Sequence, residues 1–218
     1  MNKSQTNHHF KILVLGATGG TGRAIVTQAL ARGDEVTVFV RSAEKAASFK
    51  GVKVLVGDMR DEEALRRALK GQDAVISALG TPASPFKEVT ILSAATRTLV
   101  RVMKAETVSR IVAITGIGSG DSVRHGGFMF DNVIFPLLLR KVYADKNRQE
   151  SMLRESGLDW TLVRPSVLND KPGGHEVRAL TDLSDFHGGT IARSDVAKFV
   201  LDEVRQGRWQ KRAPLITW

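Results

Sequence analysis

A glycine-rich turn between an apolar run and a helical segment constrains this chain more than any other feature. Residues 11–15 read Lys-Ile-Leu-Val-Leu and predict a buried strand, and residues 20–32 have helical spacing of apolar side chains. The turn between them reads Gly16-Ala-Thr-Gly19-Gly20-Thr-Gly22. A tight turn needs residues without Cβ, and a helix N-terminus offers bare N–H groups to an anion. The context favours a phosphate-binding turn in a βαβ unit over a glycine-rich turn without a ligand.

The rest of the chain continues the alternation of short apolar runs and helical segments. Further strands are predicted at residues 35–40, 52–56, 73–77, 110–114 and 159–163, with a short one near 176–179. Helices are predicted at residues 42–50, 61–70, 85–105, 143–156 and 194–205, the last capped by Ser194. Strands that are apolar throughout imply a parallel sheet covered on both faces.

The predicted fold class is therefore α/β, a single-domain, doubly wound parallel sheet. The dinucleotide-binding, Rossmann-like domain spans residues 11–218, and residues 1–10 form a flexible leader. The stretch after the sixth strand is short, which leaves room for a small C-terminal substrate flap and not for a large substrate domain.

Composition narrows the partners. The 218 residues include 32 Lys and Arg against 23 Asp and Glu, a net charge of +9 that suits polyanionic partners such as a phosphorylated cofactor, nucleic acid or an acidic surface. The absence of Cys excludes disulfides, thiolate zinc sites and a Cys nucleophile. It also permits a reducing compartment. The densest apolar run, residues 133–139, is far shorter than the ~20 residues of a membrane span. We expect a cytoplasmic protein without a membrane partner.

Two other classes of site find little support. The five His residues have no ligand-like spacing, so no metal site is expected. The basic residues between Arg205 and Arg212 are interleaved with only one aromatic residue, Trp209, and are interpreted as a solvated terminus. No nucleic-acid partner is therefore expected.

The end of the second predicted strand indicates the cofactor. An NAD site would carry Asp or Glu there to hold the ribose 2′-hydroxyl, but this chain reads Phe-Val-Arg41-Ser. Arg41, with Lys45 one turn further on, can pair with the 2′-phosphate of NADP. The sequence therefore predicts NADPH over NADH, unless Arg41 is a solvated surface charge.

Two further positions lie at the same predicted sheet edge. Asp58 follows the third strand, where a carboxylate can accept from an adenine amino group; it can also cap the helix that begins at Asp61, and the two roles can coexist. Leu79-Gly80-Thr81 follows the fourth strand, where a glycine lets the backbone approach a cofactor closely.

Three residues are candidates for catalysis. Thr115, Tyr143 and Lys146 resemble the hydroxyl, Tyr and Lys set that reduces carbonyls in short-chain dehydrogenases, but that set needs Tyr and Lys four residues apart. Here they are three apart and Asn147 holds the fourth position, a change that rotates the Lys by about 100° around the helix. Tyr143 is either a proton donor or a packed aromatic residue, and Lys146 is a candidate for contact with the ribose or the substrate. Gly-x-Ser-x-Gly around Ser119 fails because Ile117 replaces the first glycine.

Taken together, these motifs resemble the atypical short-chain dehydrogenases/reductases, most closely the biliverdin IXβ reductase (flavin reductase) group, with the NmrA-like NAD(P)H-binding proteins as cousins. The matching segments are residues 16–22, 40–42, 57–58, 71–76, 79–81, 153–158 and 163–165. The resemblance implies a doubly wound sheet with NADPH bound across it, and hydride transfer to a planar acceptor such as FMN, riboflavin, a quinone or a bilin.

The resemblance also assigns the site. The implied cofactor-binding residues are Gly16, Thr18, Gly19, Gly20, Thr21, Gly22, Arg41, Lys45, Asp58, Met59, Leu79, Gly80, Thr81, Thr115, Lys146, Pro165, Ser166 and Val167. Gly118 to Gly127 are expected to form a mobile lid. The apolar residues that would line an acceptor pocket, or else pack in the core, are Phe128, Met129, Phe130 and Phe135.

The chain departs from the biliverdin IXβ reductase pattern at three positions. Gly116 stands where that reductase has Ser, and Lys146 and Val167 stand where it has His, which leaves the acceptor open. The leading interpretation is an NADPH-dependent reductase, a monomer or weak homodimer. The alternative is a non-catalytic NADP(H) redox sensor of the NmrA-like type that acts through a protein partner. A sugar-nucleotide epimerase ranks third, because no substrate domain is present.

Overall fold

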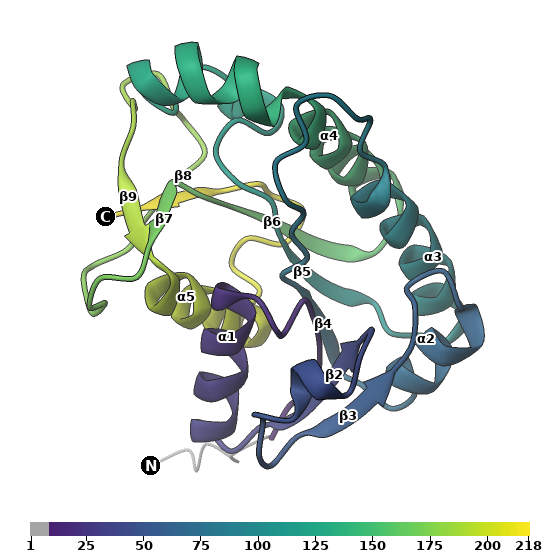
Figure 1. Cartoon of the computed structure of the whole chain (residues 1–218). Coiled ribbons are helices and arrows are strands. Elements are labelled where there is room, and N and C mark those ends of the chain that lie inside the picture. Colours follow the sequence, from purple (N-terminus) through teal and green to yellow (C-terminus); the bar gives the residue numbers. More distant parts are fainter. Residues whose placement is uncertain (1–8) are drawn as a thin grey trace, which may run out of the picture.

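The computed structural model describes residues 9–218 and contains an eight-stranded sheet in the order β3-β2-β1-β4-β5-β6-β10-β8 (Figure 1). Its strands are β1 (Lys11–Leu15), β2 (Glu35–Val40), β3 (Lys53–Val56), β4 (Ala74–Ser77), β5 (Arg110–Ile114), β6 (Asp159–Pro165), β8 (Arg178–Leu180) and β10 (Leu215–Thr217). Only β8 runs antiparallel to its neighbour. This is the predicted doubly wound α/β fold.

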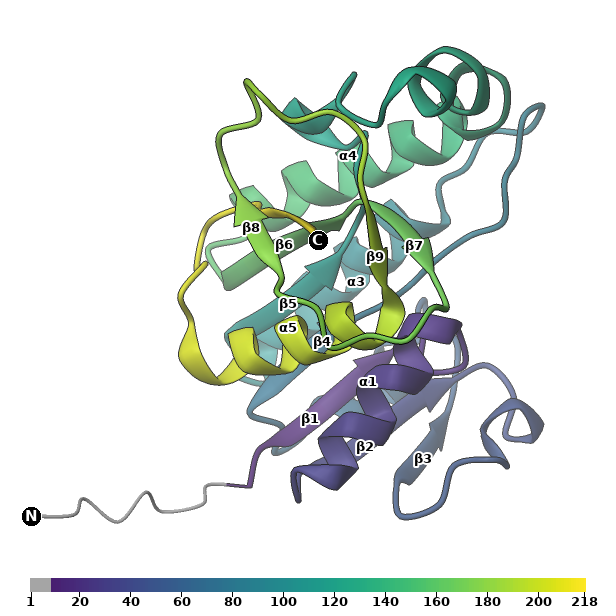
Figure 2. The same ribbon diagram turned by 90° about the vertical axis from the view of Figure 1, so that its left-hand side faces the viewer.

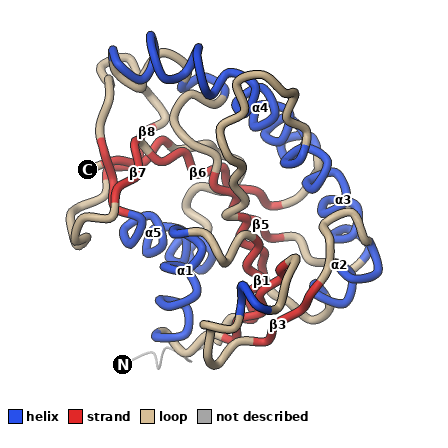
Figure 3. The backbone as a smooth tube through the Cα atoms, in the orientation of Figure 1, coloured by secondary structure: helices blue, strands red, loops and turns tan. Residues whose placement is uncertain are grey.

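Helices cover both faces of the sheet (Figure 3). One face carries α1 (Gly20–Ala31) and α5 (Arg193–Gln206), and the other carries α2 (Glu62–Leu69), α3 (Ile91–Ala105) and α4 (Arg140–Glu155). Strand β1 divides its buried side chains between the two core clusters, with Ile12 and Val14 in one and Leu13 in the other. That division explains why the strand is apolar at every position after Lys11.

The order of the strands reverses between β1 and β4. The chain adds β2 and β3 on one side of β1, and β4, β5 and β6 on the other side. Doubly wound sheets bind ligands in the crevice beyond the carboxyl ends of the strands at such a reversal. The glycine-rich turn follows β1 directly, so it lies at this crevice.

The structure corrects the predicted start of α3. The helix begins at Ile91, not at residue 85, because the carboxylate of Asp145 on α4 accepts the N–H of Leu92 at 2.8 Å together with the N–H and hydroxyl of Ser93. Asp145 is fully buried. A helix start leaves these N–H groups without intrahelical partners, so a side chain from another helix acts as the cap.

Other predicted boundaries also differ. The helix expected at residues 42–50 is reduced to the short turn η1 (Glu44–Ala46), and the strand expected near 176–179 is β8. The predicted cap Ser194 lies inside α5, whose N-cap is Ala192 with no side-chain hydrogen bond. The three-residue strands β7 (Val167–Asn169), β9 (Thr190–Ala192) and β10 are too short to give a periodic signal.

The two ends of the predicted domain can be placed only in part. Residues 1–8 of the expected leader lie outside the described residues. His9 donates from Nδ1 to the carbonyl of Gly33, and Phe10 hydrogen-bonds with Asp34 and Glu35, so both are attached to the start of β2. The predicted C-terminal flap contains β7, β8 and β9, which lie above α5 in Figure 2. Within residues 9–218, no helix is long and apolar enough to cross a membrane.

The buried cap gives a test of the fold. We expect Asp145→Ala to lower the free energy of unfolding by about 3 kcal/mol, because it leaves buried N–H donors on α3 unpaired. Asp61→Ala is the matched control: Asp61 caps α2 through a 3.0 Å bond from the N–H of Ala64 but is exposed, so about 1 kcal/mol is expected. Urea unfolding followed by circular dichroism measures both, and equal losses would contradict the role assigned to Asp145.

Candidate functional site

The glycines of the turn after β1 occupy their positions for different physical reasons. Gly16 has φ +75°, and a Cβ there would lie 2.6 Å from the carbonyl carbon of Ala78, just after β4. A Cβ on Gly22 would lie 2.8 Å from the Cα of Ala17. A Cβ on Gly19 would meet only ordinary contact, 3.5 Å from the oxygen of Gly16. Gly16 and Gly22 therefore allow close backbone packing, and the backbone at Gly19 stays open to a ligand.

The N-terminus of α1 is suited to an anion. Gly19 is its N-cap and makes no side-chain cap bond, and the first turn, which the structure describes in full, has no acidic residue. The N–H groups of this turn have no intrahelical acceptor, and the helix dipole places partial positive charge there. The residues fit the pyrophosphate of a dinucleotide.

Arg193 lies against this same turn and was not found from the sequence. A Cβ on Gly20 would lie 2.9 Å from its Cδ and 3.0 Å from its Nε. Its guanidinium pairs with Asp170 at 2.8 Å. A cation beside the positive end of a helix favours an anion between them. No local sequence pattern places Arg193 here, because only the packing of α5 on α1 brings residue 193 close to residue 20.

A second basic region follows β2. Arg41 and Lys45 are both exposed, and Arg23 of α1 holds the turn that carries Lys45. Its Nη1 donates to Ser48 Oγ at 2.8 Å, and its guanidinium lies 5.2 Å from the ring centre of Phe49. With basic residues and no acidic residue at the end of β2, the region fits a 2′-phosphate.

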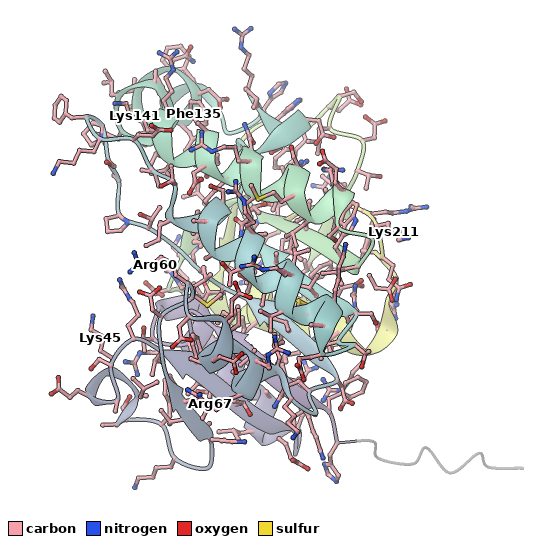
Figure 4. The ribbon with its side chains drawn as sticks, turned by 90° about the vertical axis from the view of Figure 1, so that its right-hand side faces the viewer. Lys45, Arg60, Arg67, Phe135, Lys141 and Lys211 are labelled. Atoms are coloured by element: carbon pink, nitrogen blue, oxygen red, sulfur yellow. The ribbon has the colours of Figure 1, made fainter. Side chains whose placement is uncertain are left out.

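Asp58 is held by Arg60, whose backbone N–H and guanidinium donate to the carboxylate at 2.8 to 2.9 Å. These bonds, with the charge of Arg41 as a smaller contribution, lower the pKa of Asp58 to about 2. Asp58 is not the cap of α2, because that cap is Asp61. Arg60 and Lys45 project from the same side of the molecule (Figure 4). The Asp58 carboxylate is therefore ionised and oriented at this edge.

The remaining positions of the cofactor half lie after β3 and β4. Met59 and Leu79 are half-buried against the core cluster on the α2 and α3 side. A Cβ on Gly80 would meet nothing within 4 Å, and Thr81 beside it is half-buried. The backbone at Gly80 is therefore open, as the prediction of close cofactor approach requires.

A cavity of about 550 Å³ opens beyond the carboxyl ends of β5 and β6. Its lining combines the sequence-predicted Thr115, Tyr143 and Lys146 with the segment that follows β6. The other lining residues are Ile114, Gly116, Ile117, Gly126, Gly127, Phe128, Met129, Phe130, Ile134, Pro165, Ser166, Val167 and Leu168. The structure thus brings the three candidates for catalysis next to the residues after β6 that were predicted to bind the cofactor.

Tyr143 and Lys146 converge on Gly116 without forming a pair. A Cβ on Gly116 would lie 3.0 Å from the Tyr143 hydroxyl and 3.4 Å from Lys146 Nζ. The ammonium donates to the carbonyl of Thr115 and lies 4.9 Å from the Tyr143 ring centre. Burial lowers the pKa of Lys146 to about 8 and raises the pKa of the Tyr143 phenol. Gly116 has φ +142°, so the Ser of the related pattern would be strained and crowded here.

A buried charge network connects Thr115, which lines the cavity, to α4 and β6, and sequence analysis missed it. The Thr115 hydroxyl donates to Glu150 at 2.8 Å, and Arg164 of β6 donates to both oxygens of Glu150 at 3.0 and 2.6 Å. Arg164 also pairs with Asp121. Glu150 is one turn beyond Lys146 on α4 and favours its charged form. The sequence feature that could have indicated this network is an Arg inside the largely apolar strand β6.

The segment expected to be a lid borders the cavity through Gly126 and Gly127. Asn147, at the position where the related pattern has Lys, accepts the N–H of Gly120 at 2.9 Å. His125 accepts at its carbonyl from Gly188 at 2.7 Å and bonds through Nδ1 to the carbonyl of Phe186 at 2.8 Å. The segment is thus tied to α4 and to the loop before β9.

The apolar candidates fall into two groups. Phe128, Met129 and Phe130 line the cavity, and the first two are too exposed to be core residues. Phe135 is not a lining residue; its ring packs 5.1 Å from that of Tyr143. Ser166 lines the cavity, but its hydroxyl is occupied by a 3.0 Å bond with Thr217 of β10. Among residues 9–218, no group of three or more metal-ligating side chains lies together.

Comparison with known proteins agrees with this geometry. Residues 16–206 match the NAD(P)H-binding family. The chain is 29% identical over 211 residues to YhfK of Bacillus subtilis, described as an uncharacterized sugar epimerase, and the match covers 93% of this chain and 92% of YhfK. It is 30% identical to YwnB of the same organism over 202 residues, covering 89% of this chain and 92% of YwnB.

Two solved structures have the same fold. ChuY, an anaerobilin reductase of Escherichia coli O157:H7, superimposes with a TM-score of 0.80 at 23% identity and covers 95% of this chain and 96% of its own. A short-chain dehydrogenase/reductase of Veillonella parvula in complex with NADP gives a TM-score of 0.80 at 15% identity, covering 97% and 95%. Together with the matching residues above, these findings establish that the chain belongs to the NAD(P)H-binding family of Rossmann-fold proteins, in agreement with the predicted atypical short-chain dehydrogenase/reductase.

Proposed function

We propose that this protein is an NADPH-dependent oxidoreductase that transfers a hydride to a planar acceptor such as a flavin (FMN or riboflavin), a quinone or a bilin. The observation that carries the proposal is the largely apolar cavity beside Thr115 and Lys146, at the same edge of the sheet as the glycine-rich turn. A ring system placed there would lie next to a dinucleotide bound across that edge. ChuY, which has this fold, is named for reduction of a bilin-type compound.

The proposed cofactor site follows the dinucleotide from one end of the crevice to the other. Asp58 and Met59 contact the adenine, and Arg41 and Lys45 pair with the 2′-phosphate. The backbone around Thr18, Gly19, Gly20 and Thr21 receives the pyrophosphate. The nicotinamide half lies against Leu79, Gly80, Thr81, Thr115, Lys146, Pro165, Ser166 and Val167. When bound, NADPH supplies the hydride.

The chain's own residues position and shield the acceptor. Phe128, Met129 and Phe130 offer apolar contact and exclude water from the cavity. Lys146 donates a hydrogen bond to a ribose or acceptor oxygen, since its ammonium already lies at the cavity wall. Tyr143 and Thr115 offer hydroxyls, and the bond from Thr115 to Glu150 fixes the direction of one of them. Catalysis then rests mainly on positioning.

A non-catalytic NADP(H) sensor is the second candidate, and one observation favours it. The Lys146 ammonium bonds to the Thr115 carbonyl instead of the Tyr143 hydroxyl, so the acid pair of carbonyl reductases does not form. Burial also raises the pKa of Tyr143, which weakens it as a proton donor. A sensor would keep the cofactor site and need no acceptor.

Anaerobic oxidation of NADPH by the purified protein tests the proposal. We expect turnover with at least one of FMN, FAD, riboflavin, quinones and biliverdins, followed by the absorbance of NADPH. Tight NADPH binding without oxidation by any of these would favour the sensor, and a protein partner would then be sought with the NADPH-loaded protein.

The choice of cofactor gives a second prediction. We expect Arg41→Glu to weaken NADPH binding by about tenfold or more, because it replaces a charge-assisted phosphate contact by repulsion. NADH binding should change little. The matched control is Arg97→Glu, which makes the same charge change on exposed α3. Nicotinamide fluorescence measures the dissociation constants of NADPH and NADH for both variants. Equal loss of NADPH affinity in both variants would contradict the assignment of Arg41 to the 2′-phosphate.

The pH dependence of turnover should report Lys146. Its pKa of about 8 means that it is charged below pH 8 and neutral above it. A role as a charged donor therefore predicts that kcat/KM falls as pH rises through about 8. Lys146→Arg should move that fall to higher pH, because guanidinium stays protonated. An unchanged profile in Lys146→Arg would remove Lys146 from the reaction.

Two further expectations stay predictions. A cytoplasmic location is proposed from the composition, although three relatives from Arabidopsis thaliana are described as chloroplastic. A monomer or weak homodimer is proposed as the working state, and sedimentation equilibrium would measure it.

A further inference from the structure

An exposed apolar surface lies on one end of the molecule. It is formed by η3 (Phe130–Leu139), a π-helix with Pro136 inside it and no buried residue, together with the two residues before it. Phe128 is 82% exposed and Leu137 is 65% exposed. The members of this surface, which we call the apolar cap, are Phe128, Met129, Val133, Ile134, Leu137 and Leu138. Exposed groups of large apolar side chains of this kind mark sites of interaction.

The apolar cap is continuous with the cavity. Phe128, Met129 and Ile134 belong both to the cap and to the cavity lining. Figure 1 places the helix of residues 130–139 at the top of the molecule, beyond the start of α4. Whatever covers the cap therefore also faces the entrance of the cavity.

The border of the cap is basic. Residues 124–141 contain Arg124, Arg140 and Lys141 against one acidic residue, Asp131, whose carboxylate accepts the N–H of Gly126 at 3.2 Å. Lys141 donates to the carbonyl of Phe86 in the loop before α3, and Phe86 is itself highly exposed. Figure 4 places Lys141 beside Phe135 at this end of the molecule.

The charge separates two occupants of the cap. A second copy seated on the same surface would bring the two basic borders together, and each chain carries a net charge of +9. An anionic bilayer has the opposite charge, and exposed apolar side chains flanked by basic residues bind such surfaces through apolar burial and electrostatic attraction together.

We propose that the apolar cap docks on an anionic phospholipid bilayer, inserting Phe128, Met129, Leu137 and Leu138 among the lipids while Arg124, Arg140 and Lys141 contact the head groups. This docking needs no membrane-spanning helix. It differs from the expectation, drawn from the sequence, that the protein has no membrane partner. The entrance of the cavity then faces the lipid, and an apolar acceptor dissolved there reaches it without crossing water.

Flotation of the full-length protein with lipid vesicles tests the proposal and needs neither cofactor nor acceptor. Vesicles of phosphatidylcholine alone are compared with vesicles containing phosphatidylglycerol. We expect at least tenfold more protein to float with the anionic vesicles, and 0.5 M salt to reduce that binding. A Phe128→Trp variant should also show a blue shift of its added fluorescence on anionic vesicles only. Failure here leaves the NADPH oxidation assay unaffected, so the two proposals fail separately.

The double variant Leu137→Ser with Leu138→Ser should lose the binding. The matched control is Val54→Ser with Val56→Ser, which removes two exposed apolar side chains from the edge strand β3. Thermal unfolding verifies that both fold. The proposal is overturned by absence of flotation, by equal flotation with both lipids, or by a double variant that still binds. It is also overturned if the unaltered protein forms a dimer that the Leu double variant disrupts, because the cap then belongs to a second copy.

Discussion

The acceptor side of this molecule depends on the carboxylate of Glu150. It is 3% exposed and is bonded by the hydroxyl of Thr115 from β5 and by both ends of the Arg164 guanidinium from β6. An ion pair at this depth is stable only when its geometry is good and its remaining hydrogen-bonding capacity is filled. Here one carboxylate joins α4 to two adjacent strands, so the helix that carries Tyr143 and Lys146 is fixed relative to the sheet.

The cofactor side depends on a different constraint, the close approach of backbones. Gly16 lies against the backbone after β4, and Gly22 lies against the turn that Gly16 begins. Neither position has space for a side chain. The N-terminus of α1 is therefore held at one place in the crevice. Two charged side chains lie beside the turn, Arg193 from α5 and Arg23 from α1 itself. For the proposed binding of a pyrophosphate, such an arrangement limits what binding must reorder.

Sequence reasoning succeeded where the physical demand is local. The turn at residues 16–22 could be found because a strand, a tight turn and a helix follow one another, and the parallel strands β1 to β6 could be found because they are largely apolar. It failed where the cause is distant. The cap of α3 comes from Asp145, more than fifty residues away in sequence, and Arg193 reaches Gly20 only through the packing of α5 on α1.

The helix η3 was missed for a related reason. Pro136 is a signal for the end of a helix, and the apolar run around it has no polar face from which to infer an orientation. No residue of this helix is fully buried, so its sequence resembles a core segment while most of its apolar side chains lie at the surface. Composition alone cannot distinguish a core segment from such a surface helix, because the difference depends on whether other elements of the fold cover it.

The spacing of Tyr143 and Lys146 has a structural consequence for the chemistry. When the Tyr and Lys of the usual pair are four positions apart, the ammonium lies under the phenol and makes it acidic. With three, it contacts the carbonyl of Thr115, and Asn147 takes the fourth position and holds the turn at Gly120. The phenol then has no cation paired with its oxygen, and burial raises its pKa. Under the proposed reductase function, such a site would suit acceptors that do not require a protein acid at the moment of hydride transfer, and conjugated ring systems meet that condition better than an isolated carbonyl does.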